Sequence, residues 1–426
     1  DEPLPPPNPD RERIERLERE LSSLRREVEE DRKGRVTASL PIRLSGFIQA
    51  DAVLHREDSE DQLDDSTGRP LNETRYLIRR AHLHADATWR FLAGSIEIDG
   101  STVRDPLVRL FGAEVAARWP EEGAVPLVLL SIGLMRIPFG AENPQRDIDR
   151  LFLERSNMTR SLFPGGSDLG VRLGGGYRIL RWQIAVMNGH PNGEQGYPLL
   201  DATEAKDGVG RLGIEATAAS GRVRLRGGVS GLFGTGLHPG TPGTKDRVDW
   251  RDDNGDGVVQ PSELHPILGV AATPAATFRR FALGADALVE IDVPRLGVLT
   301  LFGELLWAGN LDRALMPADP VSTGRDLREL GWFAGLTQEI TRWAIVGVRY
   351  DRYDPDADAM VQQGAIAVPK DAGFSTLAVS AAVQAPPWGR LVLEYDHNTN
   401  ALGIGPSGAP ATLGSDAVTL RAQMAF

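Results

Sequence analysis

The sequence ends on Val418-Thr-Leu-Arg-Ala-Gln-Met-Ala-Phe426, a stretch in which apolar and polar side chains alternate. A period of two places the two sets of side chains on opposite faces of a β-strand. In a membrane-spanning barrel the apolar face meets lipid, the polar face meets the lumen, and aromatic residues lie at the interface. The stretch therefore predicts the last strand of a bacterial outer-membrane barrel, although a soluble edge strand could show the same alternation.

The same alternation recurs after Gly34 and predicts an all-β fold, a 16-stranded antiparallel transmembrane β-barrel. Short connections such as Pro294-Arg295 alternate with long ones, except at 101–105 and 118–125. Short periplasmic turns and long external loops are typical of bacterial barrels. An even strand count then places both termini in the periplasm, and a soluble β-sandwich is the alternative. The strands are expected at 41–53, 73–87, 91–100, 106–117, 126–137, 168–175, 179–189, 209–219, 222–232, 280–292, 296–308, 329–339, 342–352, 373–385, 389–397 and 416–426.

Composition narrows the class of protein. The chain has 426 residues and a formal net charge of −12, which argues against nucleic acid as a partner because phosphate binding needs a basic surface. It has no Cys, as suits an oxidising envelope. No run of about 18 apolar residues occurs, so membrane-spanning helices are not expected. The chain starts at Asp1 without a basic and apolar leader, as a mature secreted protein would.

The first 35 residues differ from the rest. Residues 1–9 are Pro-rich and predict an extended tail, and residues 10–35 predict a periplasmic coiled coil ahead of a barrel domain at 36–426. Apolar residues recur there at spacings of three and four, and the surrounding pattern resembles that of short trimeric coiled coils. A lone amphipathic helix is the alternative. The residues expected to hold a trimer together are Arg13, Ile14, Leu17, Glu18, Leu21, Leu24 and Val28.

Several motifs occur in a fixed order: Arg79-Arg-Ala-His-Leu83, Gly133-Leu-Met-Arg-Ile-Pro-Phe-Gly-Ala-Glu142, Leu151-Phe-Leu-Glu-Arg155 and Gly165-Gly-Ser-Asp-Leu-Gly-Val-Arg172. With the final strand, they resemble the phosphate-selective porin O and P family. The resemblance implies a trimeric sixteen-stranded porin in which the loop after Pro138-Phe139-Gly140 folds inward and narrows the pore.

The charges of that loop depart from the family pattern. Members that select phosphate carry Lys residues after the Pro-Phe-Gly turn, whereas this chain has mixed charges at 143–150, which predict a modest ion preference. The expected pore constriction consists of Arg146, Asp147, Asp149, Arg150, Glu154, Arg155 and Arg160. Only four of 47 basic residues are Lys. Lumen candidates for a basic strip are therefore all Arg, namely Arg43, Arg80, Arg222, Arg224, Arg226, Arg349 and Arg421.

A metal-binding pattern lies in the longest loop. Residues 252–263 match the twelve positions of an EF-hand calcium loop, with Gly257 at the sharp turn. A solvated Asp/Gly turn is the alternative. The expected ligands of a structural Ca²⁺ are Asp252, Asn254, Asp256, Val258 through its carbonyl, Gln260 through a water, and Glu263. A second acidic run, at Asp351, Asp354, Asp356 and Asp358, is interpreted as a solvated loop tip.

These features together predict an outer-membrane porin that passes small hydrophilic solutes or ions by passive diffusion. No enzyme is expected, because no Gly-x-Ser-x-Gly nucleophile elbow occurs. The expected partners are two further copies in a homotrimer, outer-membrane lipid and lipopolysaccharide, and the cell wall through the coil. An envelope tether or ligand-binding barrel is the alternative, followed by an outer-membrane hydrolase.

Overall fold

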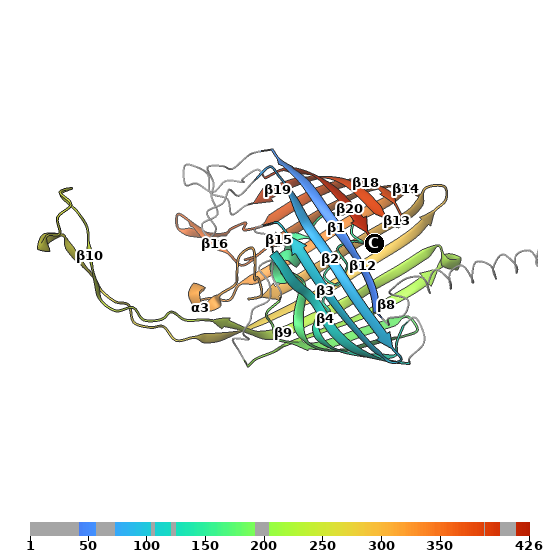
Figure 1. Ribbon diagram of the computed structural model, residues 1–426, viewed down its shortest axis with the longest axis horizontal. Coiled ribbons are helices and arrows are strands. Elements are labelled where there is room, and N and C mark those ends of the chain that lie inside the picture. The colour runs from blue at the N-terminus through green and yellow to red at the C-terminus, as the bar shows by residue number, and fades with distance from the viewer. Residues whose placement is uncertain are drawn as a thin grey trace, which may run out of the picture.

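The fold is a closed antiparallel barrel of sixteen strands (Figure 1). The computed structural model describes residues 42–56, 73–103, 107–120, 125–191, 204–386, 388–400 and 415–426. The barrel strands, in order, are β1 (Ile42–His55), β2 (Arg75–Trp89), β3 (Leu92–Ser101), β4 (Leu107–Trp119), β5 (Val128–Arg136), β6 (Ser167–Tyr177), β7 (Leu180–Met187), β8 (Asp207–Ala218), β9 (Val223–His238), β12 (Ala276–Val293), β13 (Gly297–Gly309), β14 (Arg328–Thr341), β15 (Ala344–Asp354), β18 (Phe374–Ala385), β19 (Gly389–Asn400) and β20 (Ala417–Ala425).

The predicted strand order is confirmed, because each expected strand overlaps one barrel strand and each pairs with its neighbours along the chain. The barrel closes where β1 pairs with β20, from Phe47 opposite Ala425 to His55 opposite Ala417. Strands β9 and β12 are longer than expected and stay paired as far as His238 and Ala276. The predicted coiled coil and its trimer residues lie outside the described residues.

Side chains alternate between the two faces of the wall. Outward positions such as Leu44, Ile132, Ile184 and Leu305 are apolar and exposed. Inward positions such as Asp51 are polar and buried inside the barrel. This division is the reverse of a soluble protein and agrees with a barrel whose outer face meets lipid.

The two ends of the barrel differ. Short turns join strands at one end. The long connections at the other end hold several small elements, among them hairpin β10 (Arg247–Trp250) with β11 (Leu264–Ile267), hairpin β16 (Met360–Gln363) with β17 (Ile366–Pro369), and helix α3 (Pro320–Thr323). The connection from β9 to β12 forms an arm that carries β10 far from the barrel, at the left of Figure 1. No helix in the described ranges is long and apolar enough to cross a membrane.

A segment between β5 and β6, residues 138–166, lies inside the barrel and is called the inward segment. It includes helix α2 (Asn157–Leu162). Phe139, Met158 and Leu162 of this segment are fully buried against wall residues such as Leu306 and Tyr353. An apolar cluster thus fills part of the lumen and fixes the segment there, because apolar surface removed from water stabilises the packed state.

Candidate functional site

The inward segment is bound to the wall on several sides of the lumen. Its irregular backbone leaves polar groups that need partners. The carbonyl of Ile148 accepts a hydrogen bond from Gln423 of β20 (3.1 Å), and that of Arg150 accepts one from Arg390 of β19 (2.8 Å). On the opposite side, the amide of Gly140 donates to Ser230 of β9 (3.0 Å). Because β9 and β20 are far apart in strand order, the segment crosses the interior.

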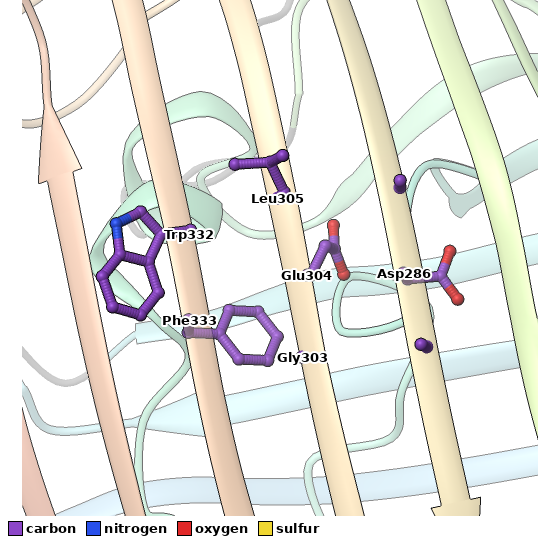
Figure 2. Close-up of a pocket in the computed structure, with 8 residues that line it drawn as sticks. Asp286, Gly303, Glu304, Leu305, Trp332 and Phe333 are labelled. Atoms are coloured by element: carbon purple, nitrogen blue, oxygen red, sulfur yellow. The ribbon is translucent and has the colours of Figure 1, made fainter.

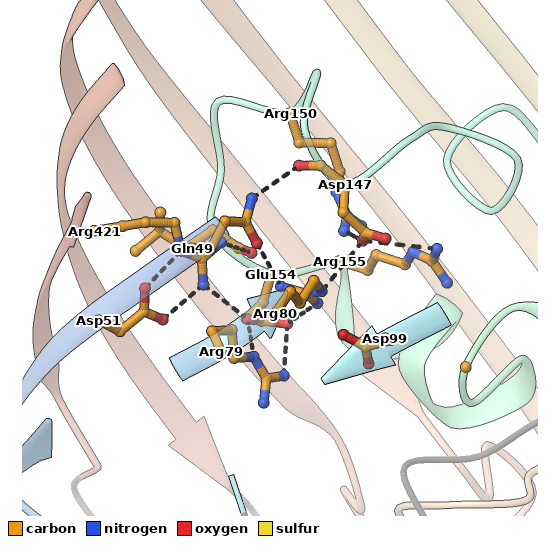
Figure 3. A network of polar contacts seen from close by, with 12 residues as sticks. Gln49, Asp51, Arg79, Arg80, Asp99, Asp147, Arg150, Glu154, Arg155 and Arg421 are labelled. Carbon is orange, nitrogen blue, oxygen red and sulfur yellow. Dashed lines mark hydrogen bonds and ion pairs between the residues drawn. The ribbon is translucent and has the colours of Figure 1, made fainter. Parts of the chain in front are cut away.

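Glu154 of the inward segment lies among three wall arginines (Figure 3). Arg79 donates from Nε and Nη2 to the two carboxylate oxygens (2.7 and 3.0 Å). Arg80 and Arg421 add further contacts at 3.2 and 3.3 Å. Such forked, charge-assisted contacts fix both the position and the charge of the carboxylate.

Adjacent arginines on β2 both reach Glu154 because of a β-bulge. The pairing of β1 with β2 shifts between Gln49 and Ala50, so that Arg80 lies opposite Gln49 and Ile78 lies opposite Ala50. The extra residue, Arg79, therefore does not follow the usual alternation of side chains between the two faces of the wall. Two neighbouring guanidinium groups point to the same side of the wall as a result.

A second carboxylate, Asp147, gathers the remaining arginines of this region. Its Oδ2 lies 2.9 Å from Arg136, its Oδ1 lies 3.6 Å from Arg80 and 4.0 Å from Arg155, and it also contacts Arg150. We use the term arginine network for these groups together with Glu154 and its partners. The network contains six arginines (Arg79, Arg80, Arg136, Arg150, Arg155 and Arg421) and three carboxylates (Asp51, Asp147 and Glu154), and so has an excess of three positive charges.

Carboxylates dominate another part of the lumen (Figure 2). Glu304 and Asp286 lie opposite each other on β13 and β12. Glu304 accepts hydrogen bonds from the amides of Ala141 (3.0 Å) and Glu142 (3.2 Å), and Asp286 accepts from Arg211. The inward segment thus contacts arginines on one side and carboxylates on another.

The predicted constriction residues fall into two groups. Asp147, Arg150, Glu154 and Arg155 belong to the arginine network. The others lie on the exposed surface of the inward segment: the Arg146 and Asp149 side chains, 3.7 Å apart, are 74% and 58% exposed, and Arg160 is an exposed residue of α2.

The predicted strip arginines are spread over the barrel. Arg349 and Arg421 are buried and paired, Arg349 with Glu142 (3.5 Å) and Arg421 with Asp51 (2.7 Å). Arg80 contacts both Glu154 and Asp147. On β9, Arg224 and Arg226 share Glu290 at 2.9 and 2.8 Å. Arg43 and Arg222 are exposed near the short-turn end.

Sequence reasoning missed several residues of the network. Arg79 appeared only as part of a family motif, and Arg136 and Asp51 received no role. The signal is weak for Arg79, which depends on a bulge, and for Asp51, whose partner Arg421 is 370 positions away, because neither leaves a local pattern. The interpretation of the second acidic run as a solvated tip is wrong for two residues: Asp351 lies on β15 and accepts from Asn157 (2.7 Å), and the buried Asp356 pairs with Arg325.

The predicted metal loop joins β10 to β11 at the tip of the arm. Ligand atoms of Asp252, Asp256 and Glu263 lie within 4.8 Å of one another. Glu263 is 3% exposed; its Oε2 accepts from Trp250 Nε1 (3.0 Å), and its Oε1 has no hydrogen-bond partner. The side chains of Asn254 and Gln260 contact Asp256, and the apolar side chain of Val258 is exposed. Several predicted oxygen donors thus come together.

An outer-membrane channel and a porin are among the solved structures similar to this barrel. The outer membrane channel DcaP of Acinetobacter baumannii has a TM-score of 0.52 at 12% identity, covering 90% of this chain and 97% of that chain. An anion-selective porin from Comamonas acidovorans has a TM-score of 0.51 at 10% identity, with coverages of 90% and 99%. No protein-family model and no curated protein matches the chain. The likeness shows a porin-like sixteen-stranded fold.

Proposed function

We propose that this protein is an outer-membrane porin that passes small hydrophilic solutes and ions by passive diffusion, with the inward segment as its constriction. The observation that carries the proposal is a segment with charged side chains that is held across the lumen of a closed barrel by contacts to β1, β9, β19 and β20. A barrel of this size leaves an aqueous channel unless its interior is filled. The fold shared with solved porins supports this function.

Anions are the preferred ions in this proposal. The arginine network carries three more positive than negative charges, and a charged constriction sets ion preference. The resemblance to phosphate-selective porins supports the inward placement of residues 138–166. High phosphate selectivity is not part of the proposal, because the Lys residues that accompany it in the family are absent.

Cysteine modification in planar bilayers tests the constriction. The chain has no Cys, so Arg146→Cys gives a single reactive thiol on the inward segment. A bulky thiol reagent should reduce the single-channel conductance of this variant. Arg247→Cys on the arm, whose side chain is 67% exposed, is the matched control and should label without an effect. Absence of conductance in folded wild-type protein would refute the channel and favour a tether.

We propose further that three copies associate through a periplasmic coiled coil at residues 10–35. The heptad pattern of Ile14, Leu17 and Leu21 supports this assembly. Deleting residues 1–35 should weaken the trimer on native gels while the barrel keeps its heat-modifiable mobility. A truncated protein that stays trimeric with equal thermal stability would assign the segment another role, such as contact with the cell wall.

We also propose that the metal loop binds a structural Ca²⁺. The support is the complete calcium-loop pattern, the proximity of Asp252, Asp256 and Glu263, and the unpaired Oε1 of Glu263. Calorimetry should detect Ca²⁺ uptake by the wild type and none by Asp252→Asn. The control is Asp253→Asn, because Asp253 points to His265 (3.0 Å) and not to the ligand group. Equal uptake by both variants would contradict the assignment.

A further inference from the structure

Five short turns at one end of the barrel each carry an exposed arginine. They are Arg90, Arg178, Arg222, Arg295 and Arg342. Within the described ranges no carboxylate forms an ion pair with any of these five side chains. Several arginines at the opposite end have carboxylate partners, namely Arg56 with Asp416 (3.9 Å), Arg352 with Asp371 (2.8 Å), and Arg325 with Asp356, whereas Arg279 of β12 is exposed without one in the described ranges. The short-turn end therefore presents a ring of uncompensated positive charge, which we call the arginine rim.

The turn geometry gives no reason for arginine at these positions. Arg90, Arg178 and Arg295 have φ values of 52°, 53° and 73°, in the left-handed region that favours Gly or Asn. In the turn closed by the Leu296 amide on the Val293 carbonyl (3.2 Å), Pro294 precedes Arg295. This is the type II pattern, whose third position normally holds Gly. The side chain itself must then have a role that offsets the backbone cost.

Aromatic rings place these guanidinium groups at the membrane interface. The Arg90 Cζ lies 5.7 Å from the Trp89 ring centre, Arg178 lies 5.4 Å from Tyr177, and Arg342 lies 4.6 Å from Trp343. All three rings are exposed, and those of Trp89 and Tyr177 continue the outward-facing alternation of β2 and β6. Exposed Trp and Tyr near strand ends mark the level of lipid head groups. The rim charges beside Trp89 and Tyr177 therefore lie at the level of the lipid phosphates of the leaflet at this end.

We propose that the arginine rim binds the phosphate groups of anionic phospholipids in the leaflet next to the short turns. This inference rests on the proposed membrane function. A guanidinium group presents a planar fork of donors that matches a phosphate, and it needs no protein carboxylate when lipid supplies the negative charge. At the opposite end, Arg56, Arg325 and Arg352 have protein carboxylates as partners instead.

Spin-labelled lipids test the arginine rim. The wild type is reconstituted in phosphatidylcholine vesicles with trace spin-labelled phosphatidylglycerol or phosphatidylcholine, and the protein-bound fraction of each is measured. At about 20 mM salt, phosphatidylglycerol should associate at least about twofold more strongly, and about 0.5 M NaCl should remove the preference. The variant Arg90→Gln/Arg178→Gln/Arg342→Gln should lose it. The variant Arg56→Gln/Arg325→Gln/Arg352→Gln removes as many charges from the other end and should keep it.

Equal binding of the two lipids by the wild type at low salt would overturn the inference, as would an unchanged preference in the rim variant or an equal loss in the control variant. The wild-type salt titration decides the matter even if a variant does not fold. Conductance measured in the same vesicles separates the two proposals. A conducting protein without lipid preference refutes the rim alone, and a lipid-selective protein without conductance refutes the channel alone.

Discussion

Replacing Glu154 by Gln is the sharpest test of the arginine network. The Glu154 carboxylate accepts from Arg79, Arg80 and Arg421 at 2.7, 3.2 and 3.3 Å. Glutamine has the same shape and can still accept a hydrogen bond. The substitution therefore removes one charge and preserves most of the geometry, and the excess positive charge of the network rises from three to four.

The expected change follows from Coulomb's law. An ion that passes about 6 Å from the removed charge in a water-like dielectric gains or loses about 0.7 kcal/mol. This is a factor of about three for an anion and the inverse factor for a cation, so the anion-to-cation permeability ratio should rise about tenfold. A less polar surrounding would enlarge the change, and salt would screen it, so low ionic strength gives the clearest result.

The assay is the reversal potential of single channels in a KCl gradient. Asp149→Asn is the matched control, because it also removes one carboxylate from the inward segment, but its side chain is 58% exposed and contacts only Arg146 within the described contacts, outside the network. Its effect should be several times smaller. If Glu154→Gln leaves the reversal potential unchanged, or shifts it no more than Asp149→Asn does, ions do not pass the network and the reasoning is wrong.

Three further perturbations test the segment, its turn and the loop end. Phe139→Ala should destabilise the inward packing by about 3–5 kcal/mol, because the ring is fully buried, and should raise cleavage of the segment by protease in folded barrels. Gly140→Ala should also disturb the segment, since Gly140 has a φ of +65° and a Cβ there would collide with the Glu304 carboxylate; noisy or altered conductance reports it. Partial burial alone would raise the pKa of Asp319, but hydrogen bonds from Ser322 and His238 outweigh this effect and lower the pKa to about 2. Because the folded protein favours the ionised form of Asp319, this carboxylate stabilises the start of α3 fully above about pH 4, the pKa in the unfolded chain. The stabilisation is lost as the pH falls through about 2. Hydrogen exchange of the first α3 amides, corrected for intrinsic rate, should therefore accelerate at pH 2, and Asp319→Asn should remove the pH dependence.

The strands could be predicted because each carries its own signal. Alternation of apolar and polar residues fixes a strand and the face that meets lipid, without reference to any other part of the chain. The long connections carry no such signal. Hairpins β10–β11 and β16–β17 have only four residues per strand, which is too short to establish a period, and the β10–β11 strands are exposed, so no buried face distinguishes them.

The candidate site could be predicted only in part. Asp147, Arg150, Glu154 and Arg155 were predicted to line a constriction, and the structure brings these four side chains together in the arginine network, while their role in a pore stays a prediction. Their partners could not be found, because Glu154 meets Arg421 across 267 positions of sequence. The position of Arg79 depends on a bulge that no residue type in the sequence predicts. Which side chains pair inside the lumen depends on how the barrel closes, so the pairs cannot be inferred from a single strand.

The preference for arginine over lysine in this chain links pore shape to pore charge. A lysine offers a compact, mobile charge, whereas the planar guanidinium of Arg421 holds Asp51 with two 2.7 Å bonds and still donates to the carbonyl of Leu153 at 2.9 Å. The same side chain thus sets local charge and fixes the backbone of the inward segment. Substituting such an arginine changes the constriction and the selectivity together. Removing a carboxylate by an isosteric amide changes the charge with little change of shape, and for this reason Glu154→Gln, and no arginine variant, separates the electrostatic role of the network from its structural one.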